Sequence, residues 1–160
     1  MKCCVQRGLK HMYAIPAERS KDMLVYRLRH IYDNSEYDLA CPMTLGYFSN
    51  IQKANEAIEY YRSIEGYRNY PNGFIIEECN VRTKKELTKL YEAYFSFSDG
   101  EDIYEHTDEI GVFDTKREAL LAVNRFKALN QKLIMDSVLT KEIDVFEYEI
   151  DKKYALDAFD

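Results

Sequence analysis

The chain has 160 residues and a formal net charge of −6, and 46% of its residues are hydrophobic while 31% are charged. These values are typical of a globular protein with a substantial core, and they argue against a disordered chain. The acidic balance argues against nucleic acid as a partner, because phosphates would be repelled. No apolar run approaches the ~20 residues that a membrane helix needs, so we expect no membrane partner either.

The cysteines favour a reducing compartment. Four cysteines occur without a C-x-x-C pair. Since a chain of this size folds without disulfides, we expect free thiols and a cytoplasmic protein. The first residues lack the apolar core of a secretion signal. We interpret residues 1–22, which are basic, as an appendage that precedes a single domain at 23–160.

The first predicted strand covers residues 24–32, where apolar and polar residues alternate. This period of two places Arg27 and Arg29 on one face and the apolar side chains on the other, as in a half-buried strand. A second, short strand is expected at residues 46–48. A third strand, at residues 73–81, is expected after the intervening helix.

That helix is predicted from its start signal and its apolar stripe. Ser49 with Gln52 predicts a capping box. Ala54, Ile58 and Tyr61 recur at three- and four-residue steps along one side of the helix. Alanine in this stripe would let the helix approach a sheet closely, and Tyr61 is expected in the core.

The same pattern returns later in the chain. Residues 45–66 align without a gap on residues 110–131 and are identical at one Gly, one Phe and two Ala positions. In the second stretch Thr115 with Glu118 predicts another capping box. The similarity extends back to residues 89–97, where helical spacing competes with alternation. The alignment on the first strand favours a strand there.

We therefore predict an α+β fold of two tandem ββαβ repeats, residues 24–82 and 89–150, with a linker at 83–88. The repeats are expected to share a mainly antiparallel or mixed sheet with both helices on one face and pseudo-twofold symmetry. Sharing is expected because one unit of about 60 residues has only a marginal core. A bulge near Glu77 and Glu147 would switch the faces of the last strands.

Several of these motifs occur together in known proteins. The run G-x-F-S, the helix with A-x-x-A-I and the segment GYRNYPNGFIIEE resemble a family of small uncharacterised bacterial and phage domains. That family shows a G-x-F-S/T helix entry and a G-F/Y-x-x-Y/F-P-x-G-F turn into the last strand. Residues 24–82 match throughout, and residues 89–150 match as far as the helix. The resemblance implies a compact α+β fold, no known catalytic residues and no substrate.

The segment 66–74 concentrates the residue types that dominate binding hot spots. We predict a partner-binding surface formed by Tyr67, Arg68 and Tyr70, together with Tyr60 of the preceding helix. The alternative interpretation is structural: Pro-Asn-Gly in this segment is ordinary turn chemistry, and the rings would then pack beneath the loop.

The stretch 98–110 holds six acidic residues and no basic one. Its carboxylates suit a hard cation, but their spacing differs from that of an EF-hand. A solvated loop or an electrostatic footprint for a basic partner are the alternatives. The three histidines are widely separated, and no nucleophile motif or phosphate loop occurs. We therefore predict no catalytic residue, no metal and no cofactor.

These observations favour a non-enzymatic protein-interaction or regulatory module that binds a protein partner or associates with itself. The alternative is a small-molecule sensor whose ligand lies in the cleft between the two repeats.

Overall fold

The computed structural model describes residues 20–31, 42–98, 106–131 and 140–154. In chain order the elements are β1 (Lys21–Ile31), β2 (Pro42–Phe48), α1 (Ile51–Arg62), the 3₁₀ turn η1 (Tyr67–Asn69), β3 (Phe74–Thr83), β4 (Lys89–Ser98), β5 (His106–Phe113), α2 (Lys116–Leu129) and β6 (Thr140–Glu149). Neither helix in this part of the chain is long and apolar enough to cross a membrane.

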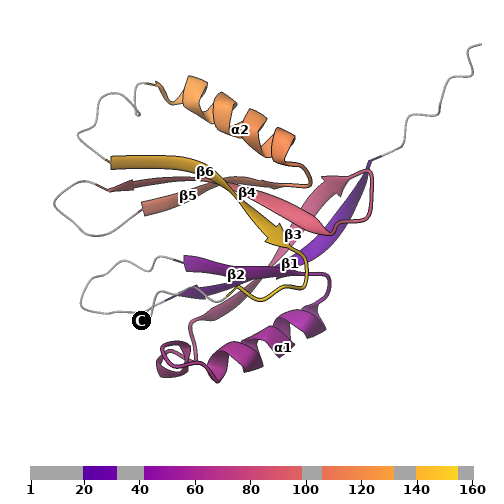
Figure 1. Ribbon diagram of the computed structural model, residues 1–160, viewed down its shortest axis with the longest axis vertical. Helices are drawn as coiled ribbons and strands as arrows, with labels where there is room; N and C mark the ends of the chain where they lie inside the picture. The colour runs from indigo at the N-terminus through magenta and orange to yellow at the C-terminus, as the bar shows by residue number, and fades with distance from the viewer. Residues whose placement is uncertain (1–19, 32–41, 99–105, 132–139, 155–160) are drawn as a thin grey trace, which may run out of the picture.

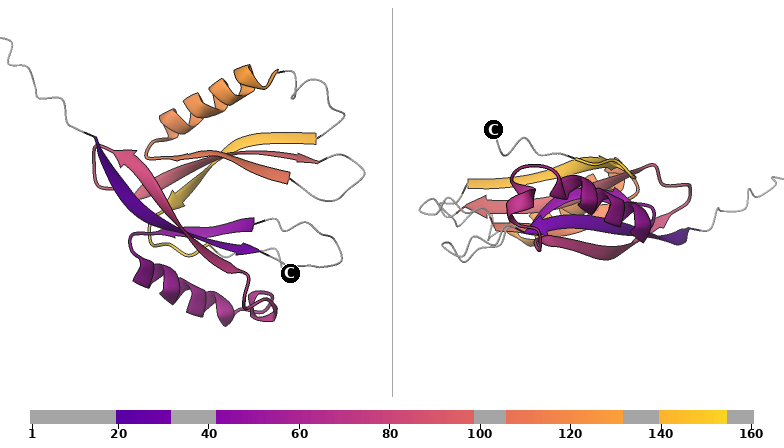
Figure 2. Two further views of the ribbon diagram at one scale, coloured as in Figure 1. Left: turned by 180° about the vertical axis from the view of Figure 1, so that it is seen from behind. Right: turned by 90° about the horizontal axis from the view of Figure 1, so that it is seen from below.

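The strands form two separate antiparallel sheets, with the orders β2-β1-β3 and β5-β4-β6. The sheets lie face to face, α1 covers the outer face of the first sheet, and α2 covers that of the second (Figure 1). Figure 2 shows the same layers from behind. The predicted α+β class is confirmed. The prediction of one shared sheet with both helices on one face is wrong, because each sheet buries one face against its helix and the other against the opposite sheet.

The first helix packs as its apolar stripe predicts. Its interface with the first sheet is formed by the buried residues Leu28, Leu45, Phe48, Ala54, Ala57, Tyr61 and Tyr67. Ala54 and Ala57 are fully buried, and their small side chains bring the helix axis close to the strands. Tyr61 is also in the core as predicted, and burying a side chain of this size stabilises the fold by roughly 1.5–3 kcal/mol.

The second helix covers its sheet through fewer buried residues. Ala119 and Val123 pack on Ala93 of β4, and the ring of Phe126 lies 5.2 Å from that of Phe95. The predicted start of this helix is confirmed, since the side chain of Thr115 caps it and accepts a hydrogen bond from the Glu118 amide.

The start of α1 differs from the prediction by one residue. Asn50, not Ser49, is the N-cap, and its side chain accepts a hydrogen bond from the Lys53 amide at 2.9 Å. Ser49 instead donates hydrogen bonds to the carboxylate of Asp151, from its amide at 2.8 Å and from its hydroxyl at 3.0 Å. Asparagine and serine are equally good caps. The gapless alignment pairs Asn50, not Ser49, with the cap Thr115, and this signal would have identified the right residue.

The bulges lie on a different strand pair from the one expected. Strands β1 and β3 pair without interruption from Lys21↔Thr83 to His30↔Phe74. The register shifts instead between β1 and β2, next to Leu28, and between β4 and β5, next to Ala93. The expected bulge near Glu77 and Glu147 is therefore absent from these described strands, since the bulges are on the opposite edge of each sheet.

The bulge in β2 sets which side chains point inward. Gly46 has a φ of 150°, which a residue with a side chain rarely adopts. Leu45 and Phe48 on either side of it pack toward α1, whereas Tyr47 packs between the sheets. A regular strand would have placed residues 45 and 47 on the same face.

The apolar part of the space between the sheets is built from both halves of the chain. The buried residues there are Val25, Tyr47, Val81, Leu87 and Leu90. The ring of Tyr148 from β6 meets that of Tyr47 edge-on at 5.2 Å. Cys79 is half-buried at this interface, where its thiol packs as a small hydrophobic group.

The chain after β6 returns to the first half. Residues 150–154 run beside β2, with a parallel bridge from Ile150 to Tyr47. The amides of Asp151 and Tyr154 donate to the carbonyls of Tyr47 and Leu45, at 2.8 and 3.1 Å. This segment covers the outer edge of β2 with backbone hydrogen bonds, which removes an exposed strand edge.

Candidate functional site

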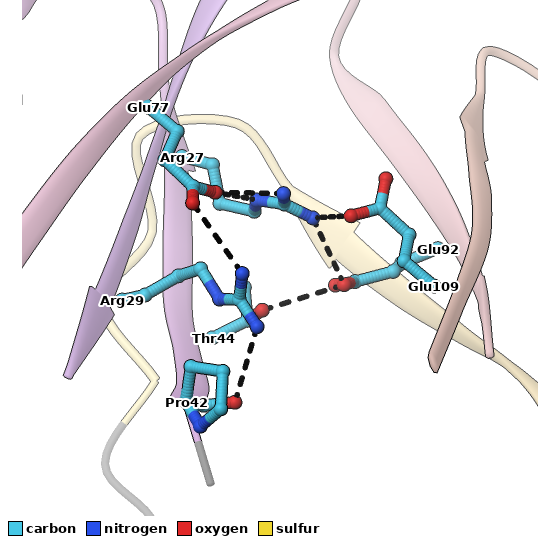
Figure 3. A network of polar contacts seen from close by, with 7 residues as sticks. All are labelled: Arg27, Arg29, Pro42, Thr44, Glu77, Glu92 and Glu109. Atoms are coloured by element: carbon cyan, nitrogen blue, oxygen red, sulfur yellow. Dashed lines mark hydrogen bonds and ion pairs between the residues drawn. The ribbon is translucent and has the colours of Figure 1, made fainter. Parts of the chain in front are cut away.

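The first candidate site is a group of charged residues between the sheets. The guanidinium of Arg27, on β1, donates to Glu77 of its own sheet at 2.8 Å from Nε. Its Nη1 reaches the second sheet, where it contacts Glu92 of β4 at 3.3 Å and Glu109 of β5. Figure 3 shows the guanidinium lying between Glu77 on one side and the two carboxylates of the opposite sheet on the other.

Further polar groups extend this cluster toward β2. Arg29 contacts Glu77 at 3.4 Å and donates to the carbonyl of Pro42 at the same distance. The hydroxyl of Thr44 donates to Glu92 at 3.4 Å. We call Arg27, Arg29, Thr44, Glu77, Glu92 and Glu109 the inter-sheet polar cluster.

Burial controls the charge states in this cluster. Burial raises the pKa of Glu92, although the charge of Arg27 opposes the shift. Burial tends to lower the pKa of Arg27, but Tyr47 and the hydrogen bond to Glu109 outweigh it and the net pKa is raised. Arg27 therefore stays charged, and its charge compensates the buried carboxylate of Glu92 and the two partly exposed carboxylates of Glu77 and Glu109.

The geometry of the cluster suits joining the sheets. Arg27 contacts three carboxylates from three strands. The planar guanidinium suits this arrangement, because its fork of N–H donors can bind several carboxylates at once. Within the described residues, no group of three or more His, Cys, Asp and Glu is placed to hold a metal ion. The sequence placed Arg27 and Arg29 correctly on one face of the strand but gave no sign that a second sheet covers this face.

The second candidate site is the predicted segment 66–74. Tyr67 is only 1% exposed, and its ring packs against Tyr61 at 5.2 Å and edge-on to His30 at 5.0 Å. Its ring therefore belongs to the core beneath the loop and not to a contact surface. This part of the arrangement follows the structural alternative that the turn chemistry offered.

The other predicted residues are placed differently. Arg68 is exposed and donates to the carbonyl of Ser63 at 3.0 Å. Tyr70 is half-exposed. Tyr60 is 43% exposed, on the outer side of α1, where the ammonium of Lys153 lies 4.5 Å from the centre of its ring. Arg68 and Tyr70 thus share one loop, and Tyr60 lies on the helix before it.

Beside this loop there is a surface hollow of about 540 Å³. Its lining consists of Ile31, Asn69, Tyr70, Pro71, Asn72, Gly73 and Ile75. Apolar side chains from β1 and β3 form part of the lining, while two amide side chains and a tyrosine contribute polar groups. This combination of an apolar lining and a few polar groups is typical of recognition surfaces.

The loop is held firmly on the first sheet. The Ile31 amide donates to the carbonyl of Gly73 at 2.8 Å, and the buried ring of His30 hydrogen-bonds through Nε2 to the carbonyl of Tyr70 at 3.0 Å. A Cβ on Gly73 would lie 2.3 Å from the Ile31 carbonyl oxygen, so only glycine permits this approach. Burial lowers the pKa of His30, against the effect of that hydrogen bond.

The remaining predictions on site residues have mixed outcomes. Of the acidic stretch, residues 99–105 lie outside the described residues, so cation binding there stays a prediction. Glu109 from the same stretch is in the inter-sheet polar cluster, where it faces a base from a distant strand. His30 has a structural role, since its buried ring holds the carbonyl of Tyr70, whereas His11 lies outside the described residues.

Comparisons with known proteins identify no relative: no family model, no curated protein and no solved structure matches this chain.

Proposed function

We propose that this protein is a non-enzymatic interaction or regulatory module that binds another protein through the hollow beside residues 66–74. The observation that carries the proposal is the anchored loop itself. The hollow of about 540 Å³ has a partly apolar lining and is bordered by the loop residues Asn69, Tyr70, Pro71 and Asn72. Hydrogen bonds with β1 fix this loop in place. A surface that is already rigid loses little conformational entropy on binding.

Arg68 and Tyr70 are the residues we assign to contact. Arginine and tyrosine are enriched among the side chains that contribute most to binding energy. Arg68 is exposed beside the hollow, and Tyr70 lies in its lining. Tyr60 is also exposed, and with Lys153 over its ring it would extend the surface along α1.

We also propose that the two ββαβ units are copies related by an approximate twofold axis. Arg27 and Glu92, which contact each other, stand 65 positions apart, and the two bulges beside Leu28 and Ala93 have the same separation. Contact between equivalent positions is what a twofold axis produces.

Two further contacts support this symmetry. Arg27 contacts Glu109, and Glu92 contacts Thr44. Thr44 and Glu109 are again 65 positions apart, so they are equivalent positions in the two halves. The contact of Arg27 with Glu109 is therefore repeated, with the two halves exchanged, as the contact of Glu92 with Thr44. The loop at 66–74 has no counterpart of similar sequence in the second half, so the partner would bind one half only.

The second candidate, a small-molecule sensor in the cleft between the halves, has less support. The centre of that space is occupied by the Arg27 guanidinium and by the rings of Tyr47 and Tyr148. A ligand would have to displace a buried charge from its carboxylates, which costs several kcal/mol.

Affinity capture with matched variants tests the proposed function. The bait proteins are the wild type, the double variant Arg68→Ala and Tyr70→Ala, and Lys127→Ala as a control at an exposed position on α2. We expect the wild type and the control to recover a partner protein in equal amounts. The double variant should recover at least about tenfold less of it, since hot-spot truncations cost ~2 kcal/mol.

The same proteins are compared by sedimentation to detect self-association. A dimer that the double variant abolishes would identify a second copy of the chain as the partner. Equal recovery of every captured protein by all three baits, together with unchanged sedimentation, contradicts the proposal. Unchanged circular dichroism of the double variant is the folding control.

A further inference from the structure

A basic surface lies on the opposite side of the molecule from the loop at 66–74. One hollow of about 660 Å³ is bounded by the β3–β4 turn and the first turns of α2. A second, of about 280 Å³, continues along α2 over Phe113 and Ala122. The two hollows share Glu118 and Leu121, so they form one continuous surface, which we call the α2 groove.

The charge of the α2 groove is opposite to that of the chain. Its basic residues are Arg82, Lys84, Lys85, Arg117 and Arg125. The acidic residues in its lining are Asp114 and Glu118, and Asp22 faces Arg82 from outside at 3.6 Å. The lining therefore carries a net charge of +3 in a protein whose net charge is −6. Such segregation creates a local positive potential that attracts acidic groups.

The middle of the α2 groove is apolar. Leu121, which lines both hollows, is 47% exposed, although the other side of the helix is buried on the second sheet through Ala119 and Val123. Leu121 stands four residues after Arg117 and four before Arg125, so one apolar side chain is flanked by two guanidinium groups on one stripe of the helix.

We propose that the α2 groove docks an acidic segment of a partner protein that carries apolar anchor residues. Five basic groups around the groove would pair with its carboxylates, and its apolar side chains would cover Leu121. Phosphate backbones of nucleic acid satisfy the first requirement only, since they offer no apolar group to cover the exposed Leu121. This inference goes beyond the proposed function, because it concerns a second surface, formed by α2 and the β3–β4 turn.

A binding assay with a defined probe tests the proposal. The probe is a labelled synthetic peptide in which Asp and Glu alternate with Leu and Phe. A second peptide has the same charges but Ala in place of Leu and Phe, and a single-stranded oligo-dT represents nucleic acid. We expect the wild-type protein to bind the acidic-apolar peptide best, with an affinity that falls as salt is added.

Variants of the full-length protein locate the binding. The double variant Lys84→Glu and Lys85→Glu should bind the acidic-apolar peptide roughly fivefold to tenfold more weakly, because each exposed pair contributes up to about 1 kcal/mol. Leu121→Ala should weaken the binding of the acidic-apolar peptide but leave the binding of the Ala peptide unchanged. The control Arg62→Glu, a single charge reversal on α1, should change the binding of neither peptide.

Three results would overturn the proposal. The first is no measurable binding of the acidic-apolar peptide by the wild type. The second is equal or tighter binding of the Ala peptide or the oligonucleotide, which would indicate charge attraction without apolar anchoring. The third is a loss caused by Arg62→Glu as large as that caused by the double variant. All of the substituted side chains are exposed, and unchanged circular dichroism of each variant is the folding control.

Discussion

Arg27 and Glu92 face each other across the two sheets, with Nη1 and Oε1 3.3 Å apart. Both side chains are largely buried, at 8% and 11% exposure. Each comes from the central strand of its own three-stranded sheet. The pair therefore joins the middles of the two sheets, and the same guanidinium also holds Glu77 and Glu109. The halves of the chain are connected by charge in the polar part of the interface and by apolar packing in the rest.

The two strand glycines should respond differently to substitution. Both have φ near 150°, so alanine is strained at either position. At Gly46 the added Cβ would lie 2.7 Å from the Lys152 carbonyl oxygen, whereas at Gly111 the nearest atom is in the Phe113 ring at 3.0 Å. A side chain can move aside more easily than a backbone carbonyl. We expect Gly46→Ala to cost more than ~1 kcal/mol of unfolding free energy and clearly more than Gly111→Ala.

Urea unfolding of the two glycine variants measures this difference. Equal losses, or a larger loss for Gly111→Ala, would mean that the segment after β6 does not press against β2 as the structure describes.

His30 should make the fold less stable in mild acid. Burial lowers its pKa in the folded state below the unfolded value of about 6.5. The unfolded chain therefore binds a proton more readily, and the stability present above pH ~6.5 is lost as pH falls toward the folded pKa. NMR titration of the ring protons, assigned with a His30→Gln variant, should give a pKa below the ordinary value.

The ring titration is preferable to a stability profile, because Glu92 acts in the opposite direction. Its raised pKa means that its own contribution is lost as pH rises. A pKa for His30 at or above 6.5 would be inconsistent with a buried ring that supports the carbonyl of Tyr70.

Tyr61 should hold the end of the chain on the first half. Its hydroxyl lies 3.0 Å from the Leu45 carbonyl oxygen and 2.8 Å from that of Tyr154. Tyr61→Phe removes this hydrogen-bond donor from both carbonyls and should lower the free energy of unfolding by about 1 kcal/mol. The amides of Asp151 and Tyr154 should exchange with deuterium faster than in the wild type, while those of β1 and β3 keep their rates relative to global unfolding.

Tyr60→Phe is the matched control for this experiment, since that side chain is exposed on the same helix. If exchange at Asp151 and Tyr154 is as slow in Tyr61→Phe as in the wild type, the hydroxyl does not hold the segment.

Much of the fold follows from local patterns. The alternation in residues 24–32 and 89–97 predicted strands, and the structure has β1 at Lys21–Ile31 and β4 at Lys89–Ser98. At residues 89–97 helical spacing was equally visible, and only the alignment with the first strand gave the right answer. Spacing also predicted the buried side of α1, because an apolar stripe on a helix has one interpretation.

The arrangement of the sheets could not be predicted in the same way. Alternation separates two faces of a strand but does not say what covers the polar one. Arg27 looked like a solvent-facing residue because its carboxylate partners are 50 to 82 positions away in sequence. The chain segment at 150–154 likewise carries no periodic signal, since its contacts with β2 are made mainly by the backbone.

The candidate site, residues 66–74, was chosen from residue types alone. Arg68 is exposed and Tyr70 is half-exposed, whereas Tyr67 is buried. Composition does not separate a ring that contacts a partner from one that packs beneath a turn. Partner binding by this loop remains a prediction.

The Arg27–Glu92 contact joins the two halves of the chain across one interior. A double-mutant cycle on this pair measures that connection. Urea unfolding of Arg27→Met, Glu92→Gln and the double variant gives the coupling free energy between the two side chains. The single change Arg27→Met should cost about 3 kcal/mol of unfolding free energy, because it leaves the buried carboxylate of Glu92 uncompensated. We expect a coupling of about 1–3 kcal/mol; losses that add within ~0.5 kcal/mol would mean that this pair does not join the two sheets.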